Sequence, residues 1–129
     1  MNDKDAHCPC GGGGFARCCA RYLLDGEVPP DAATLMRSRY SAYVLGDEAY
    51  LLQSWHPSTR PQPPLMEDAV KWLGLEVRQH QQQDDRAAVE FVARYRSGGR
   101  GHRLHEISNF VREQGRWFYV DGSFPESGK

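Results

Sequence analysis

The sequence predicts an α+β fold in which two or three helices precede a four-stranded antiparallel meander. Three observations predict it. Apolar side chains recur at three- and four-residue spacing between residues 31 and 55, and they alternate with polar ones from residue 75 onward. All four cysteines lie within residues 8–19, which marks a separate head. Helices packed in a strongly bent antiparallel sheet form a cone, a shape that often encloses a pocket.

The composition is that of a globular domain: 129 residues, 40% hydrophobic and 26% charged, with a formal net charge of -1. A net charge so close to zero implies no bulk attraction to nucleic acid or to an anionic membrane. Neither a signal-peptide pattern nor an apolar run of about 18 residues occurs. We therefore expect a cytoplasmic protein with reduced thiols and no membrane partner.

The first two segments are the head and the helices. The head ends in "ARYLLDG", a short helix that stops at Gly26, so we expect a head over 1–26 and an α+β domain over 27–129. After the loop "EVPPD", Asp31 caps a helix, and Gly46 and Asp47 break it so that Asp47 caps a second one.

The remaining segments are a loop and the strands. The prolines of "HPSTRPQPP" predict a loop, and "LMEDAVKWLG" (65–74) predicts a short helix or turn. Strands follow in "LGLEVRQH", with Leu73, Leu75 and Val77 on one face, and in "AAVEFVARYRS", "RLHEISNFVRE" and "RWFYVDGSF". Polar or glycine-rich turns, "QQQDDR", "SGGRGH" and "REQGR", join them.

The cysteines follow the spacing C-x-C, seven residues, then C-C. Local disulfides between neighbours this close are geometrically disfavoured. Zinc accepts four thiolates tetrahedrally at about 2.3 Å, so one zinc ion is the favoured interpretation, with iron second. Redox-active thiols and no defined role are the weaker alternatives. The expected ligands are Cys8, Cys10, Cys18 and Cys19.

Four thiolates around one divalent ion carry excess negative charge, and we expect Arg17, Arg21 and the backbone amides of "GGGG" to offset part of it. His7 is interpreted as a bystander rather than a ligand. A phosphate-binding loop is disfavoured, because no Lys-Ser/Thr pair follows the glycines and no strand precedes them.

The cluster "CPCGGGGFARCC" resembles the SEC-C motif, the small zinc knuckle known from the tail of the preprotein translocase motor SecA. It shares the C-P-C-G opening, an aromatic residue (Phe15) three positions before the closing pair, and the C-C itself. Gly12 replaces the usual serine, and the loop is one residue shorter than the common eight.

Further stretches, "LMRSRYSAYVLGDEAYLLQSWHPSTRP", "WLGLEV", "VEFVARYRSGG" and "HEISNFVREQGRWFYVDG", are similar to the bacterial YchJ family. The resemblance covers residues 8–124. It implies an N-terminal SEC-C zinc knuckle followed by a nuclear transport factor 2-like cone, with a single knuckle here. It names no biochemical activity.

The strand pattern places polar residues inside the cone. Glu106 shares a face with Ser108 and Phe110, while Trp117, Tyr119 and Asp121 share a face of the last strand. These acids and aromatic rings could therefore meet in one pocket.

The helices and the loop after them add His56, Trp55, Tyr40 and either Arg37 or Arg39, since two arginines about 200° apart cannot share a helix face. In a catalytic interpretation, Glu106 or Asp121 pairs with an arginine and His56 acts as acid, base or anchor. The favoured alternative is structural: a buried ion pair between an arginine and Glu106, with His56 ordering its loop and the tryptophans in the core.

The favoured hypothesis is a non-enzymatic binding module whose zinc head docks a protein partner and whose cone holds a small molecule or forms a homodimer. Dimerisation would bury convex-face residues expected to be exposed: Val92, Ile107, Phe118 and Val120. One alternative is an isomerase or dehydratase that uses the pocket for proton transfer, with His56, Glu106 and Asp121 as weak catalytic candidates. The least supported is nucleic-acid or ribosome binding, because Arg17 and Arg21 make too small an electrostatic footprint.

Overall fold

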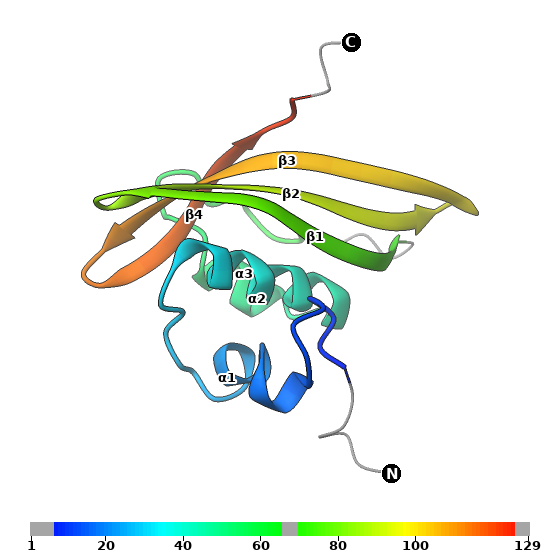
Figure 1. Cartoon of the computed structure of the whole chain (residues 1–129), viewed down its shortest axis with the longest axis horizontal. Helices are drawn as coiled ribbons and strands as arrows, with labels where there is room; N and C mark the ends of the chain where they lie inside the picture. Colours follow the sequence, from blue (N-terminus) through cyan, green and yellow to red (C-terminus); the bar gives the residue numbers. More distant parts are fainter. Residues whose placement is uncertain (1–6, 66–69, 126–129) are drawn as a thin grey trace.

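The computed structural model describes residues 7–65 and 70–125. Its strands form one antiparallel sheet in the order β1-β2-β3-β4, which confirms the predicted meander after the helices. The elements are η2 (Phe15–Arg17), α1 (Ala20–Leu23), α2 (Ala32–Leu45), α3 (Glu48–Gln53), β1 (Val70–Gln83), β2 (Arg86–Ser97), β3 (Arg100–Glu113) and β4 (Arg116–Ser123). Figure 1 shows three layers: the curved sheet, then α2 and α3, then the head with α1.

The helix boundaries follow the predicted caps. The Asp31 carboxylate accepts a hydrogen bond from the Thr34 N–H at 2.8 Å, and Asp47 accepts one from the Tyr50 N–H at 3.1 Å. Gly46 ends α2 in the left-handed conformation, with φ of 78°, which an L side chain rarely adopts. No helix in the described ranges is long and apolar enough to cross a membrane.

Two of the predicted turns between strands are tight. Gly98 and Gly99 have φ of 62° and 76°, and Gln114 and Gly115 have φ of 54° and 77°. Positive φ at both central residues is the signature of a type I′ turn, whose twist matches that of the flanking strands.

The first strand begins earlier than predicted. Residues 66–69 of the expected short helix or turn lie outside the described residues, but Val70 already pairs with Ser97 of β2. A register shift between Trp72 and Gly74 separates Leu73 from Leu75, so that Leu73 is 48% exposed instead of sharing the inner face. Pairing with β2 overrides the local helical preference of this segment.

Helix α2 is buried on several faces because the sheet covers it on one side and the head covers it on another. Met36, Arg39, Tyr40 and Tyr43 point to the sheet, at the i, i+3, i+4, i+7 spacing of one helix face. On the other side of the helix, Arg37 and Ser41 contact the head. The predicted separation of the two arginines is confirmed, with Arg39 facing the sheet and Arg37 facing the head.

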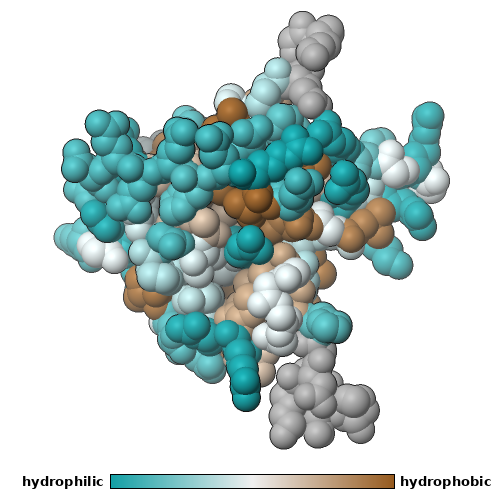
Figure 2. All heavy atoms as spheres, viewed as in Figure 1, coloured by the Kyte–Doolittle hydropathy of each residue, from teal (hydrophilic) through white to brown (hydrophobic). Residues whose placement is uncertain are grey.

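The predicted exposure of apolar residues on the convex face is wrong for Val92, which has no exposed surface. Its neighbours across the sheet are Glu76 and His105, and the His105 ring bonds the Glu90 carboxylate at 2.7 Å, so polar side chains cover it. The other three residues expected there, Ile107, Phe118 and Val120, are half-buried. Figure 2 shows hydrophilic residues over much of the sheet layer, with hydrophobic ones gathered between the sheet and the helices.

Replacing the α2 cap tests its contribution to stability. The Asp31→Ala variant should lower the free energy of unfolding by about 1 kcal/mol, because the Thr34 N–H loses its acceptor. Asp25→Ala is the control, since Asp25 caps no helix. Urea unfolding followed by circular dichroism measures both, and equal effects would contradict the capping role.

Candidate functional site

A tight loop brings the first two cysteines together. The Cys8 N–H donates to the Gly13 carbonyl at 2.6 Å, and the Gly11 N–H donates back to the Cys8 carbonyl at 2.9 Å. Gly11 and Gly13 have φ of 86° and 116°, conformations that favour glycine. The chain then turns through η2, where Cys18 is the C-terminal cap, and Cys19 is the N-terminal cap of α1.

The four sulfur atoms converge as the spacing predicts. All four lie within 4.8 Å of one another, and none of these cysteines forms a disulfide. An ideal tetrahedral zinc site with bonds of about 2.3 Å places its sulfurs about 3.8 Å apart. The residues present therefore fit a zinc ion without rearrangement of the backbone. The ligand atoms are the Sγ atoms of Cys8, Cys10, Cys18 and Cys19.

The thiols perturb one another strongly. Hydrogen bonding from Cys19, aided by Cys18 and Cys8, lowers the pKa of Cys10 to about 5 against the cost of its burial. Burial, together with the Cys10 charge, raises the pKa of Cys18 to about 12, and the hydrogen bond to Cys10 raises that of Cys19. One thiolate is thus stabilised by neighbouring S–H groups, and a divalent cation bound here would allow the other thiols to ionise.

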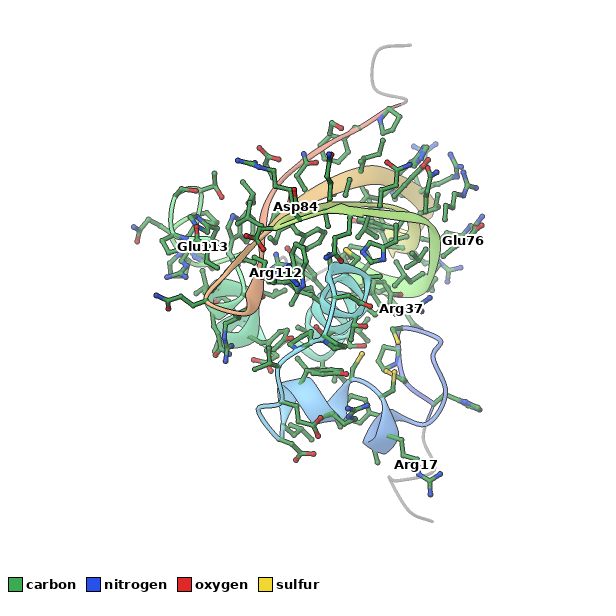
Figure 3. The ribbon with its side chains drawn as sticks, turned by 60° about the vertical axis from the view of Figure 1, so that its left-hand side comes forward. Arg17, Arg37, Glu76, Asp84, Arg112 and Glu113 are labelled. Carbon is green, nitrogen blue, oxygen red and sulfur yellow. The ribbon has the colours of Figure 1, made fainter. Side chains whose placement is uncertain are left out.

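The arginines near the cluster are not arranged as predicted. Arg21 pairs with Glu27 at 2.9 Å on the surface, and Figure 3 shows Arg17 pointing away from the sulfur atoms. Arg37 of α2 lies closer, since its Nη1 donates to the Cys10 carbonyl at 3.3 Å. Of the loop amides, that of Gly12 helps to lower the pKa of Cys10.

The glycine that departs from the SEC-C pattern lies against the sulfurs. A Cβ atom added to Gly12 would stand 2.9 Å from the Cys18 sulfur and 3.2 Å from the Cys10 sulfur. The shortened loop therefore passes close over the cluster, where a side chain would force a sulfur to move.

The head packs on α2. Cys8, Cys10 and Cys19 are buried in the same core cluster as α2 residues, and the Cys8 sulfur lies 3.5 Å from the Ser41 hydroxyl. Tyr22 of α1 is 7% exposed and joins that cluster. The cysteine cluster therefore belongs to the interior of the molecule, not to a detached tail.

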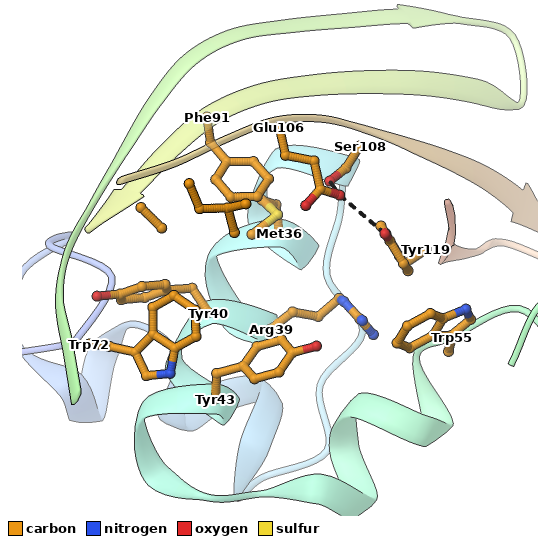
Figure 4. Close-up of a pocket in the computed structure, with 12 residues that line it drawn as sticks. Met36, Arg39, Tyr40, Tyr43, Trp55, Trp72, Phe91, Glu106, Ser108 and Tyr119 are labelled. Carbon is orange, nitrogen blue, oxygen red and sulfur yellow. Dashed lines mark hydrogen bonds between the residues drawn. The ribbon is translucent and has the colours of Figure 1, made fainter. Parts of the chain in front are cut away.

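On the opposite face of α2 a pocket of about 200 Å³ opens between the helices and the sheet. Its walls come from α2, from Trp55 after α3, and from all four strands (Figure 4). The predicted residues that reach it are Arg39, Tyr40, Trp55, Glu106 and Tyr119. The other lining residues are Met36, Tyr43, Trp72, Phe91, Ala93, Leu104 and Ser108.

Glu106 is a buried carboxylate, 8% exposed, held by neutral donors. Its Oε2 atom accepts hydrogen bonds from the Ser108 hydroxyl at 2.9 Å and the Tyr119 hydroxyl at 3.1 Å. Burial and the negative charge of Glu106 raise the pKa of Tyr119, so the phenol keeps its proton and remains a donor. A Cβ on Gly122 would lie 2.0 Å from the same oxygen, so a side chain there would displace the Glu106 carboxylate, a close approach the sequence analysis missed.

Arg39 is 3% exposed, and burial lowers its pKa. Its Nη1 donates to the Leu51 carbonyl at 2.9 Å and to the Ser54 hydroxyl at 2.7 Å. The Trp55 and Tyr119 rings flank the guanidinium, with centroids at 5.1 and 4.6 Å. The structure thus contradicts the direct ion pair between an arginine and Glu106 expected from the sequence.

Two of the three catalytic candidates lie outside the pocket. β4 carries one extra residue at Val120, because Tyr119 pairs with Phe110 while Asp121 pairs with Asn109. This bulge turns Asp121 to the convex face, where it accepts a hydrogen bond from the Asn109 amide at 2.9 Å.

His56 is held by its loop and by the end of β3. Its Nε2 lies 2.9 Å from the Glu113 carboxylate and its Nδ1 2.8 Å from the Ser58 hydroxyl. The flanking backbone pairs with the edge strand, since the His56 N–H donates to the Tyr119 carbonyl at 2.8 Å. The interpretation of His56 as a residue that orders its loop therefore fits the geometry.

Two pocket candidates lie elsewhere. Trp117 shares its strand face with Tyr119 but lies nearer the start of β4, where it borders a separate cavity of about 60 Å³ beside Tyr22. Trp117 is 2% exposed, and the Arg112 guanidinium lies 5.1 Å from the centroid of its ring. It therefore lies in the core, as the structural alternative predicted. Arg37 contacts the head instead of the pocket.

Tyr119 and Tyr43, two of the three tyrosines that line the pocket, offer a matched test. Tyr119→Phe should lower the free energy of unfolding by about 1 kcal/mol, because buried Glu106 loses one of two donors. Tyr43→Phe should change it by less than about 0.5 kcal/mol, since the Tyr43 hydroxyl bonds no described residue. Urea unfolding at pH 7 distinguishes them, and equal losses would count against the Tyr119–Glu106 bond.

Comparison with known proteins agrees with this architecture. Residues 31–122 match the family model described as YchJ, middle NTF2-like domain. A UPF0225 protein of Chromobacterium violaceum is 57% identical over 91% of this chain and 92% of its own length, and one of Ralstonia nicotianae is 55% identical over 91% and 90%.

Two solved structures are similar over the head as well as the cone. The solution structure of a SEC-C motif containing protein from Rhodopseudomonas palustris has a TM-score of 0.82 at 32% identity, covering 92% of this chain and 98% of that one. The crystal structure of a SEC-C motif containing protein from Psychrobacter arcticus has a TM-score of 0.74 at 26% identity, covering 94% and 84%. With its NTF2-like domain and its clustered cysteines, the chain belongs to the YchJ family.

Proposed function

We propose that this protein is a zinc-ordered binding module without catalytic activity: its head holds one zinc ion and docks a protein partner, and its cone holds a small molecule. The convergence of four sulfur atoms within 4.8 Å is the observation that supports the metal most strongly. Four thiolates favour zinc over harder cations, and a site closed by four protein ligands is of the structural kind.

In such a site zinc stabilises the head by cross-linking its ligands, and the chain's own residues set the geometry around the ion. The loop bonds between Cys8 and Gly13 hold the first pair of sulfurs. The Gly12 amide and the Arg37 guanidinium place partial or full positive charge near Cys10. Ser41 fixes the Cys8 sulfur against α2. These contacts orient the ligands and join the head to the cone.

Exposed apolar residues support the docking role of the head. Leu24 at the end of α1 is 73% exposed, and Val28 in the following loop is 42% exposed. Both lie next to the zinc-ordered segment, so a metal-free head would present them differently. A partner that recognises this surface would bury apolar area that water now contacts.

The pocket supports binding better than proton transfer. Of the three acid or base candidates, Glu106 alone lines it, and its Oε2 atom is occupied by two hydroxyl donors. The walls are mostly aromatic and aliphatic, with a few polar groups at defined positions, as in small-molecule binding sites.

Metal analysis tests the head directly. Protein purified without added metal should contain about one zinc per chain and little iron by elemental mass spectrometry. The double variant Cys18→Ser, Cys19→Ser should lose that zinc, and His7→Ala should keep it, because His7 is exposed and outside the sulfur cluster. A metal-free parent protein would overturn the zinc assignment.

Limited proteolysis tests whether the metal orders the head. After zinc removal with a chelator, trypsin should cut faster at Arg17 and Arg21, both exposed in the head, by about tenfold or more. Cleavage at Arg94 within β2 should stay slow, since its backbone lies in a paired strand. Adding zinc back should restore protection, and unchanged cleavage of the head would contradict the ordering role.

A further inference from the structure

The pocket contains two opposite charges that do not meet. Arg39 and Glu106 are both more than nine-tenths buried and both line the cavity, yet no ion pair joins them. The Arg39 Nη1 atom is satisfied by neutral acceptors, whereas Nε and Nη2 donate to no described residue. A buried cation therefore keeps donors available beside the pocket.

Glu106 is held in a complementary way. Both of its hydroxyl donors reach Oε2, and Oε1 accepts from no described group. Figure 4 shows one carboxylate oxygen directed to Ser108 and Tyr119 and the other turned toward the pocket. A carboxylate oxygen thus remains as an acceptor facing the same space as Arg39.

Charge balance restricts what this space can bind. One guanidinium and one carboxylate sum to zero, so a ligand with net charge would leave one buried charge without a counterion, which is costly. A ligand that carries one anion and one cation pairs both side chains and leaves the site neutral. Charge-assisted bonds to each side chain would also be short and strong in this enclosed setting.

The cavity limits the size and nature of the ligand's body. Met36, Phe91, Ala93 and Leu104 give the cavity an apolar wall. An apolar cavity of about 150 Å³ holds benzene. By the same scale, this cavity of about 200 Å³ can hold a ligand with about eight or nine non-hydrogen atoms. Tyr43, Trp55 and Trp72 are half-buried, so they border the solvent-facing side through which a ligand enters.

We propose that the cone binds a small zwitterionic amino acid with an apolar body, whose carboxylate accepts from Arg39 Nε and Nη2 and whose ammonium donates to Glu106 Oε1. This inference rests on the proposed function of the cone as a small-molecule site and specifies its ligand class. It involves no covalent step.

The first test removes one charge of the ligand at a time. L-leucine, with nine non-hydrogen atoms, is compared by ligand-observed NMR with 4-methylpentanoate, which lacks the ammonium, and with 3-methylbutylamine, which lacks the carboxylate. A second zwitterion, 5-aminopentanoate, carries its charges farther apart. At least one zwitterion should bind about tenfold or more tightly than both single-charge analogues.

The second test removes one charge of the protein. Arg39→Met and Glu106→Gln should each weaken binding of that zwitterion by about tenfold or more, while Asp121→Asn, which changes a carboxylate on the convex face, should not. Glu106→Gln should also abolish the preference for leucine over 4-methylpentanoate. Circular dichroism and zinc content check that each variant is folded. If Arg39→Met does not fold, the comparison of the four ligands still tests the zwitterion assignment.

The outcomes separate this inference from the proposed function. Equal binding of 4-methylpentanoate and the zwitterions would overturn the zwitterion assignment and leave the small-molecule site standing. No binding of any of the four compounds at about 10 mM would overturn both the ligand class and the small-molecule role of the cone. Zinc content reports separately on the head and is unaffected by either result.

Discussion

The burial of helix α2 on opposite sides is the constraint on which the structure depends. One face meets the sheet through Arg39 and Tyr40, and another meets the cysteine head through Arg37 and Ser41. A third lies against α3, where the Ser38 hydroxyl bonds the Tyr50 hydroxyl at 2.7 Å. Because the helix has so little free surface, small and hydrogen-bonded side chains take positions that large apolar residues would overfill.

This arrangement places the metal site and the pocket on two sides of the same helix. Arg37 lies two positions before Arg39, and the 100° turn per residue sends them about 200° apart. One arginine therefore contacts the cysteine loop, and the other enters the cone. Within residues 7–65 and 70–125, no carboxylate pairs with either arginine: carbonyl and hydroxyl oxygens and aromatic faces hold them. Neutral partners leave the charge of Arg39 available to a ligand.

The backbone at the edge of the sheet explains why His56 and Asp121 lie outside the pocket. The segment after α3 joins β4 at Tyr119, with the Ser54 carbonyl accepting from the Tyr119 N–H at 2.9 Å and the His56 N–H donating in return. This contact covers the otherwise open edge of the sheet at β4 and holds His56 in the loop. The neighbouring bulge moves Asp121 to the outer face. Neither the loop contact nor the bulge has a marker in residue periodicity, because both depend on which strand lies alongside.

The sequence by itself determined what local chemistry decides: the caps at Asp31 and Asp47, the glycine turns, the order of the strands and the four convergent cysteines. Each depends on residues only a few positions apart, so spacing alone carries the information. Only the tertiary structure decided which polar residues share the pocket, because a single extra residue in β4 reverses the side-chain direction beyond it. It also decided that Arg39 and Glu106 stand apart across one cavity, since their separation depends on how α2 lies under the sheet.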